Sequence, residues 1–237
     1  MFSGLFSLPV APVDCADTAP RQASTVVCQA SAQVFGSFIA GTENALVRSL
    51  ASAVMCRDLL YNPIVLYGPV GVGKSSVASG LVSRRRQQFG LSEIIETTGV
   101  DLARALAHAV ETASVTDLRS RHHRCDILLI DDLHKLAGKP AAQEFFVATL
   151  DALMHRGSLV IVTLRQSPLA TPRLSPQLAS RLMGGVVVSL ALPGPLARLE
   201  LVQQTAARMH LSLDDSQASR LACCGQSARD PFLTASR

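Results

Sequence analysis

The sequence predicts an α/β fold in which a parallel β-sheet is flanked by helices. Short apolar segments alternate with helical patterns along residues 34–192, and strands that are apolar on both faces are typical of a sheet covered on both sides. A glycine-rich turn, residues 68–75, separates one such segment from a helix, and another segment ends in the carboxylates Asp131 and Asp132. At about 150 residues per domain, the length leaves room for one such domain and a smaller appendage.

The composition excludes a disordered chain and gives no sign of a membrane protein. Apolar residues make up 48% of the 237, enough for a sizeable core, and the net charge of +4 is too small to argue for an anionic partner. The longest uncharged apolar stretch, residues 182–197, is interrupted by glycines and prolines, whereas a spanning helix needs about 20 apolar residues. The chain does not start with the basic residues of a signal peptide, and its cysteines form no C-x-x-C. We therefore expect a cytoplasmic protein with reduced thiols.

The first part of the chain, residues 1–33, lacks sustained periodicity and is predicted to form a flexible leader. Thr42 can cap a helix over residues 43–56, whose apolar side chains fall on one face. Residues 64–67 then form a short buried strand, followed by the glycine-rich turn and a helix that ends near the arginines 84–86. Cations complement the carbonyl end of a helix, so these arginines are expected on a solvated face.

The second part of the chain continues the alternation of strands and helices. One helix carries Leu102, Leu106 and Val110 on one face, and another opens at Pro140 and ends before Gly157. Strands are expected at residues 92–97, 127–130, 159–164 and 186–192. Only helical patterns follow. The predicted domains are a leader, an α/β base and a short helical lid, over residues 1–33, 34–192 and 193–237.

The glycine-rich turn satisfies the phosphate-binding pattern G-x-x-x-x-G-K-[ST]. Its glycines let the loop curl so that backbone N–H groups point at phosphate oxygens, and the following helix adds its positive N-terminal end. Lys74 would reach the β- and γ-phosphates, and Ser75 would be a ligand of Mg²⁺. The residues predicted to bind ATP·Mg²⁺ are Gly68, Pro69, Val70, Gly71, Val72, Gly73, Lys74 and Ser75.

The apolar segment over residues 127–130 ends in Asp131 and Asp132. In a protein with this phosphate-binding loop, a carboxylate at the C-terminal end of a buried strand lies beside the magnesium ion. Asp131 is therefore predicted to hold the metal, through water. Asp132 is placed to orient or deprotonate the water that attacks the γ-phosphate. The pair predicts phosphoryl transfer to water, that is, ATP hydrolysis.

These motifs are part of a wider resemblance, because the chain is similar to the AAA+ domain of the DnaA replication initiators. The similar stretches are residues 35–44, 61–68, 125–153 and 175–182, the last of which ends in Ala-Ser-Arg-Leu. Together they extend the resemblance over about residues 34–213. The resemblance implies an AAA+ fold with a helical lid, ATP and Mg²⁺ as cofactors, and slow ATP hydrolysis coupled to assembly.

The resemblance also implies roles for single residues. Arg181 matches the arginine that reaches the γ-phosphate of ATP on a neighbouring subunit. Lys139 matches a basic residue that faces single-stranded DNA in the filament channel. Arg229 matches the sensor arginine of the lid, although a proline follows where the family continues a helix. After the fourth strand the family has an acid-bearing turn, and here Thr163 and Arg165 are the imperfect substitutes available.

The function implied by the resemblance is the initiation of chromosomal DNA replication, by ATP-dependent self-assembly or by assembly with full-length DnaA. No helix-turn-helix pattern follows in the sequence, so binding to duplex origin sites is not expected. Two alternatives stay open. One is a regulator that binds full-length DnaA or a helicase loader without touching DNA. The other is a truncated fragment that binds nucleotide and does little else.

Overall fold

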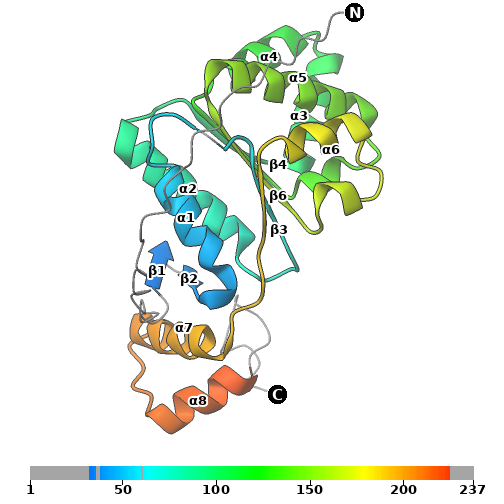
Figure 1. Ribbon diagram of the computed structural model, residues 1–237. Coiled ribbons are helices and arrows are strands. Elements are labelled where there is room, and N and C mark those ends of the chain that lie inside the picture. Colours follow the sequence, from blue (N-terminus) through cyan, green and yellow to red (C-terminus); the bar gives the residue numbers. More distant parts are fainter. Residues whose placement is uncertain (1–31, 36–37, 60, 225–237) are drawn as a thin grey trace, which may run out of the picture.

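A five-stranded parallel sheet, in the order β4-β5-β6-β3-β7, forms the centre of the molecule. The structure is a computed structural model that describes residues 32–35, 38–59 and 61–224 (Figure 1). The strands are β3 (Ile64–Tyr67), β4 (Ile94–Thr98), β5 (Ile127–Asp131), β6 (Leu159–Leu164) and β7 (Val186–Ser189). The predicted α/β fold with a helix-flanked parallel sheet is confirmed.

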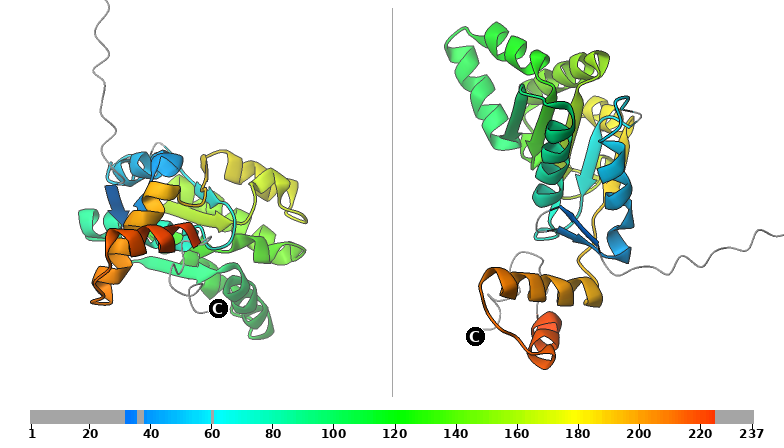
Figure 2. Two further views of the ribbon diagram at one scale, coloured as in Figure 1. Left: turned by 90° about the horizontal axis from the view of Figure 1, so that it is seen from below. Right: turned by 90° about the vertical axis from the view of Figure 1, so that its left-hand side faces the viewer.

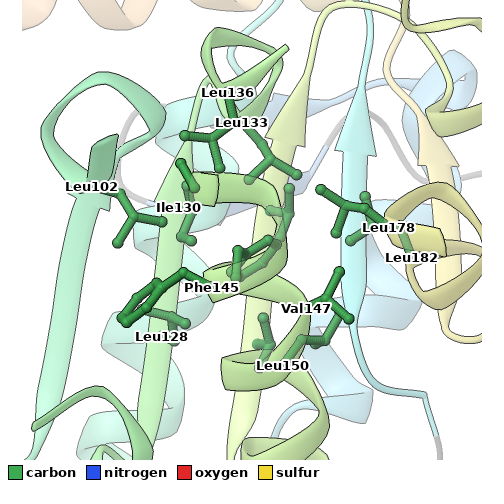
Figure 3. Packing of buried hydrophobic residues seen from close by; sticks show 14 of the residues in the cluster. Leu102, Leu128, Ile130, Leu133, Leu136, Phe145, Val147, Leu150, Leu178 and Leu182 are labelled. Carbon is green, nitrogen blue, oxygen red and sulfur yellow. The ribbon is translucent and has the colours of Figure 1, made fainter. Parts of the chain in front are cut away.

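Helices cover both faces of the sheet, and alternate residues of each strand pack toward opposite faces. Ile64 and Leu66 of β3 join one apolar cluster, and Val65 between them joins the other. Figure 3 shows the second cluster, in which leucine and phenylalanine side chains of three helices pack against the sheet. The helices of the first face are α1 (Ala45–Ala53) and α2 (Lys74–Phe89). Those of the second face are α3 (Gly99–Glu111), α5 (Pro140–Arg156) and α6 (Pro176–Met183).

The structure has two helices that were not predicted, α6 and α4. Helix α4 (Val115–Arg124) lies between α3 and β5. Its sequence is strongly polar, so it offers little apolar periodicity. The helix is fastened by His122, which is buried and whose ring meets that of Phe145 edge-on, with 5.7 Å between the ring centroids. The ring also lies within hydrogen-bonding distance of the Leu118 carbonyl, with Nδ1 2.9 Å from the oxygen. Contacts with α5 therefore stabilise α4, and these are invisible in the local pattern.

The two C-terminal helices, α7 (Pro195–Arg208) and α8 (Asp215–Cys224), pack against each other at the end of the molecule opposite α4 and α5 (Figures 1 and 2). Beside them lies an antiparallel hairpin of β1 (Ala32–Phe35) and β2 (Phe38–Ala40). In the described part of the chain, no helix is long and apolar enough to cross a bilayer.

The segment between β7 and α7 is fastened to the turn that precedes α1. Asn44 donates its amide to the Ala191 carbonyl and accepts the Ala191 N–H, at 3.0 Å in each case, and Glu43 accepts the Gly194 N–H at 2.9 Å. The predicted helix start at Thr42 is wrong, because residues 42–44 form a 3₁₀ turn without a side-chain cap and the α-helix begins at Ala45. Asn44 does not cap that helix, since both ends of its amide bind Ala191.

Among the arginines near the end of α2, Arg86 is exposed as predicted, but Arg85 does not lie on a solvated face. Arg85 is only 7% exposed, and its guanidinium donates to the carbonyls of Val54, Cys56 and Arg57, at 2.9, 2.7 and 3.4 Å. It also lies 4.5 Å from the centre of the Phe89 ring. Burial lowers the pKa of this guanidinium from its usual value. Arg85 therefore binds the carbonyl of the C-cap residue of α1 and two carbonyls of the turn that follows this helix.

The stability of the protein should depend on this contact. Replacing Arg85 by methionine keeps the aliphatic stem but leaves these three carbonyls without their donor, so we expect the free energy of unfolding to fall by about 2–3 kcal/mol. The exposed neighbour gives a matched control, since Arg86→Met should change stability by less than about 0.5 kcal/mol. Urea denaturation measures both. Equal losses in the two variants would mean that these hydrogen bonds of Arg85 do not stabilise the fold.

Candidate nucleotide site

The loop between β3 and α2 has a backbone that only glycine adopts readily at three of its positions, one of which is Gly71 with φ +84°. Gly68 has φ +153°, and a Cβ there would lie 2.3 Å from the Leu190 carbonyl oxygen. Gly73 has φ +98° and immediately precedes the first residue of α2. These three glycines let the chain turn tightly from the end of the sheet into the N-terminus of a helix. The loop thus has the form expected of a phosphate-binding loop.

Lys74, the first residue of α2, folds back over this loop. Its side chain is buried, with only 8% of the residue exposed, and Nζ donates to the carbonyl oxygens of Gly68 and Pro69, at 2.8 Å in each case. The buried ammonium is therefore solvated by carbonyl dipoles of its own loop. If a phosphate group bound in the loop, the ammonium of Lys74 could bind its charged oxygens in place of these carbonyls.

Asp131, at the C-terminal end of β5, joins the loop to the neighbouring strand. Ser75 Oγ donates to Asp131 Oδ2 at 2.7 Å, and the Thr163 hydroxyl donates to Asp131 Oδ1. A hydroxyl and a carboxylate oxygen are ligands that Mg²⁺ accepts, with the remaining positions taken by water and phosphate oxygens. The donors present therefore fit the predicted ion. Among the described residues, no three His, Cys, Asp or Glu side chains gather into a larger metal site.

Thr163 has a more direct place in this site than the sequence suggested. It is fully buried on β6 and contacts both carboxylate residues, because its hydroxyl also accepts the Asp132 N–H at 2.8 Å. The register explains this, since Ile130 of β5 pairs with Val162 of β6 and the next residues then face each other. Arg165 lies just past the end of β6 and is exposed.

Asp132 stands apart from the strand in a left-handed backbone conformation, with φ 53° and ψ 46°. Its backbone is held by Thr163, while its side chain is 44% exposed. The ring of His134 lies beside it, with Nδ1 3.8 Å from Asp132 Oδ1. Burial lowers the pKa of His134, and the nearby carboxylate of Asp132 only partly opposes this effect. A strained acid at the edge of a phosphate-binding loop is suited to act on a water molecule there.

The other predicted site residues lie outside this group. Arg181 is on α6, 51% exposed at its side chain, with Nε 2.9 Å from Asp151 Oδ1 on α5. Lys139 is exposed immediately before α5. Arg229 lies outside the described residues. The structure thus brings together the loop of residues 68–75, Asp131 and Asp132, and adds Thr163 and His134. Thr163 was hidden by the separation of its strand from Asp131 in the sequence, and His134, only two residues after Asp132, by the lack of any motif that includes it.

A parallel sheet with this strand order, a phosphate-binding loop after β3 and a carboxylate at the end of β5 defines a P-loop ATPase domain of the AAA+ class. The family described as "Bacterial DnaA ATPAse domain" matches residues 30–189. The chain belongs to this family. The predicted resemblance to the DnaA initiators is confirmed.

Individual relatives agree with this assignment. The chromosomal replication initiator protein DnaA of Limosilactobacillus reuteri (strain DSM 20016) is 28% identical over 189 residues, which are 79% of this chain and 43% of that protein. AMPPCP-bound DnaA from Aquifex aeolicus superimposes with a TM-score of 0.75 at 25% identity, covering 82% of this chain and 61% of that one. Domain III of Thermotoga maritima DnaA has the same fold, with a TM-score of 0.76 at 22% identity and 81% of each chain covered. The chain spans about two fifths of the length of the curated relatives it matches.

Proposed function

We propose that this chain binds ATP·Mg²⁺ at residues 68–75, hydrolyses ATP slowly, and uses the bound nucleotide to control assembly during the initiation of chromosomal replication in the cytoplasm. The observation that carries the proposal is the contact between Ser75 and Asp131 beside the loop that holds Lys74. It is supported by relatives that are replication initiators, among them a DnaA structure that holds AMPPCP, an analogue of ATP.

In this proposal the loop binds the triphosphate by backbone N–H groups and by Lys74, which exchanges its loop carbonyls for phosphate oxygens. Ser75 and Asp131 would hold Mg²⁺, which when bound neutralises the charge that develops on the phosphates. Thr163 keeps Asp131 oriented from the neighbouring strand. These contacts position the γ-phosphate, and positioning supplies most of the rate in phosphoryl transfer.

Two further residues complete the reaction as we propose it. Asp132 accepts a proton from the water that attacks the γ-phosphorus, and Arg181 of a neighbouring copy stabilises the charge on the transferred group. Arginines supplied in this way accelerate such reactions by about 10³–10⁵. In the single chain Arg181 is paired with Asp151 and half exposed, so it is accessible to a second copy. We therefore expect isolated chains to hydrolyse ATP slowly, because Arg181 acts only after assembly.

The proposal includes contact with single-stranded DNA through Lys139. It draws support from a solved structure of the replication initiator DnaA bound to AMPPCP and single-stranded DNA, which has a TM-score of 0.75 at 25% identity and covers 82% of this chain and 60% of that one. Lys139 is exposed at the start of α5, where a backbone phosphate can approach it. Filter binding of single-stranded DNA with ATP or ADP tests this contact. A regulator that does not touch DNA predicts no retention with either nucleotide.

ATP-dependent assembly is the experiment that tests the proposed function. Sedimentation velocity should show wild-type chains forming larger species with ATP than with ADP, and the Arg181→Ala variant should sediment with ATP as wild type does with ADP. Arg104 provides a matched control, since it is an exposed arginine paired with Asp101 at 3.4 Å on α3, and Arg104→Ala should assemble normally. If ATP produces the same species in wild type and Arg181→Ala, the role of Arg181 is wrong.

A further inference from the structure

His134 presents an unusual buried polar group close to the proposed reaction centre. It lies in the 3₁₀ turn Leu133–Leu136, its side chain is 15% exposed, and both ring nitrogens are shielded from solvent without a hydrogen-bond partner among the described residues. Buried ring nitrogens normally have hydrogen-bond partners, because burying a donor or an acceptor without a hydrogen bond is costly in free energy. An orphaned pair of nitrogens beside an active site therefore points to a partner that the ring meets at another stage of the reaction.

The charged groups around the ring indicate which form it takes. Asp132 favours the protonated ring, whereas Arg165, Lys135 and Lys74 disfavour it, and burial disfavours it more than any of them. The pKa of His134 is lowered as a result, so the ring is neutral at pH 7. A neutral imidazole has a single N–H, which can lie on either nitrogen. Nδ1 is the nitrogen close to a carboxylate, at 3.8 Å from Asp132 Oδ1.

The side chain of Asp132 likewise has no hydrogen-bond partner among the described residues. Its backbone is fixed by the bond from its N–H to Thr163, but no described residue hydrogen-bonds its carboxylate, which is 44% exposed. A general base must hold its oxygen about 2.6–3.2 Å from the heavy atom whose proton it accepts, and such contacts tighten when the substrate binds. A movement of less than about 1 Å would bring Nδ1 of His134 and Oδ1 of Asp132 to that distance.

We infer that His134 is a positioning residue for Asp132: its Nδ1–H donates to Asp132 Oδ1 when nucleotide fills the loop, and this leaves Oδ2 aimed at the attacking water. The inference rests on the proposed function. In the step, the water oxygen bonds to the γ-phosphorus while the bond from that phosphorus to the leaving oxygen of ADP breaks. The water proton passes to Asp132 Oδ2 and then to the released phosphate. The proton on Nδ1 stays on His134 throughout.

The first test needs neither nucleotide nor activity. In ¹⁵N-labelled wild-type protein at pH 7, long-range ¹H–¹⁵N spectra of the imidazole rings distinguish the two neutral forms. We expect His134 to carry its proton on Nδ1. His122 provides an internal reference for this form, since its Nδ1 lies 2.9 Å from the Leu118 carbonyl oxygen and can only be a donor there. A proton on Nε2 of His134 overturns the inference, because Nδ1 then has nothing to donate.

The second test compares His134→Leu with His134→Gln, which keeps an N–H donor, in single-turnover hydrolysis at saturating ATP·Mg²⁺. We expect His134→Leu to lower the rate about 10-fold with its affinity for a fluorescent ATP analogue within 2-fold of wild type, and His134→Gln to recover most of the rate. Thermal unfolding shows whether each variant is folded. Equal rates in all three proteins, or a loss in affinity that matches the loss in rate, overturns the inference.

The Asp132→Asn variant separates this inference from the function beneath it. If wild type and Asp132→Asn hydrolyse ATP equally slowly, the proposed function of Asp132 fails and the inference fails with it. If Asp132→Asn is slow while His134→Leu keeps the wild-type rate, only the inference fails. If both variants are slow, the double variant should be no slower than Asp132→Asn, because a positioning residue acts through the residue that it holds.

Discussion

Replacing Lys74 by alanine is expected to weaken the binding of ATP about 100-fold. Truncating one partner of a buried, hydrogen-bonded charge pair costs about 2–5 kcal/mol, and about 2.7 kcal/mol corresponds to a factor of 100 in affinity. Without nucleotide, the ammonium donates to carbonyl oxygens of the loop, which water can reach once the side chain is removed. The fold should therefore survive while the nucleotide site fails.

Titration with a fluorescent ATP analogue measures this loss, and circular dichroism checks that the variant is folded. The control is Lys139→Ala, which removes the same charge from an exposed position before α5 and should bind ATP as wild type does. An affinity for Lys74→Ala within 3-fold of wild type would mean that the loop does not bind a triphosphate through this residue.

Replacing Asp132 by asparagine is expected to lower the rate of ATP hydrolysis about 100-fold, at the lower end of what general bases contribute. Asparagine has nearly the same shape, tolerates the left-handed conformation of this position, and cannot accept the proton at its nitrogen. Affinity for ATP should stay within about 2-fold, since the hydrogen bonds and ion pair described for Asp132 join it to Asp131, Thr163 and His134 and not to the loop.

Single-turnover hydrolysis at saturating ATP·Mg²⁺ measures this rate. Asp126→Asn is the matched control, because Asp126 immediately precedes β5, at the end of the strand away from the loop, and pairs with Arg156 at 3.7 Å. That variant should hydrolyse ATP at the wild-type rate. Should Asp132→Asn also keep the wild-type rate, another group must activate the water.

The elements that the sequence predicted best are those whose formation depends on neighbouring residues in the sequence. The predicted strands at 64–67 and 159–164 coincide with β3 and β6, because each is a buried apolar run closed by turn residues. Helix α4 was missed since its stability comes from the contact between His122 and Phe145. Arg85 was misplaced for the same reason: the carbonyls that it binds lie 28 to 31 residues earlier in the chain.

The residues of the candidate site also differ in whether a sequence motif identifies them. A contiguous motif identified the loop and Lys74, and the order of motifs identified Asp131, which the structure brings to Ser75 across 56 residues. Thr163 and His134 belong to no motif. Their importance arises from the pairing of β5 with β6 and from the turn that follows β5, so only the folded chain brings them to Asp131 and Asp132.

The hydrogen bonds that hold the segment before α7 have a mechanical consequence. Glu43 and Asn44 clamp the backbone at Gly194 and Ala191, so a swing of the C-terminal helices pivots beyond Gly194 rather than along the whole connecting segment. Helix α7 has 14 residues and is about 21 Å long, which makes it a lever. A rotation of about 10° at its base moves its far end by roughly 4 Å, and the reaction force falls on the 3₁₀ turn Thr42–Asn44 that precedes α1.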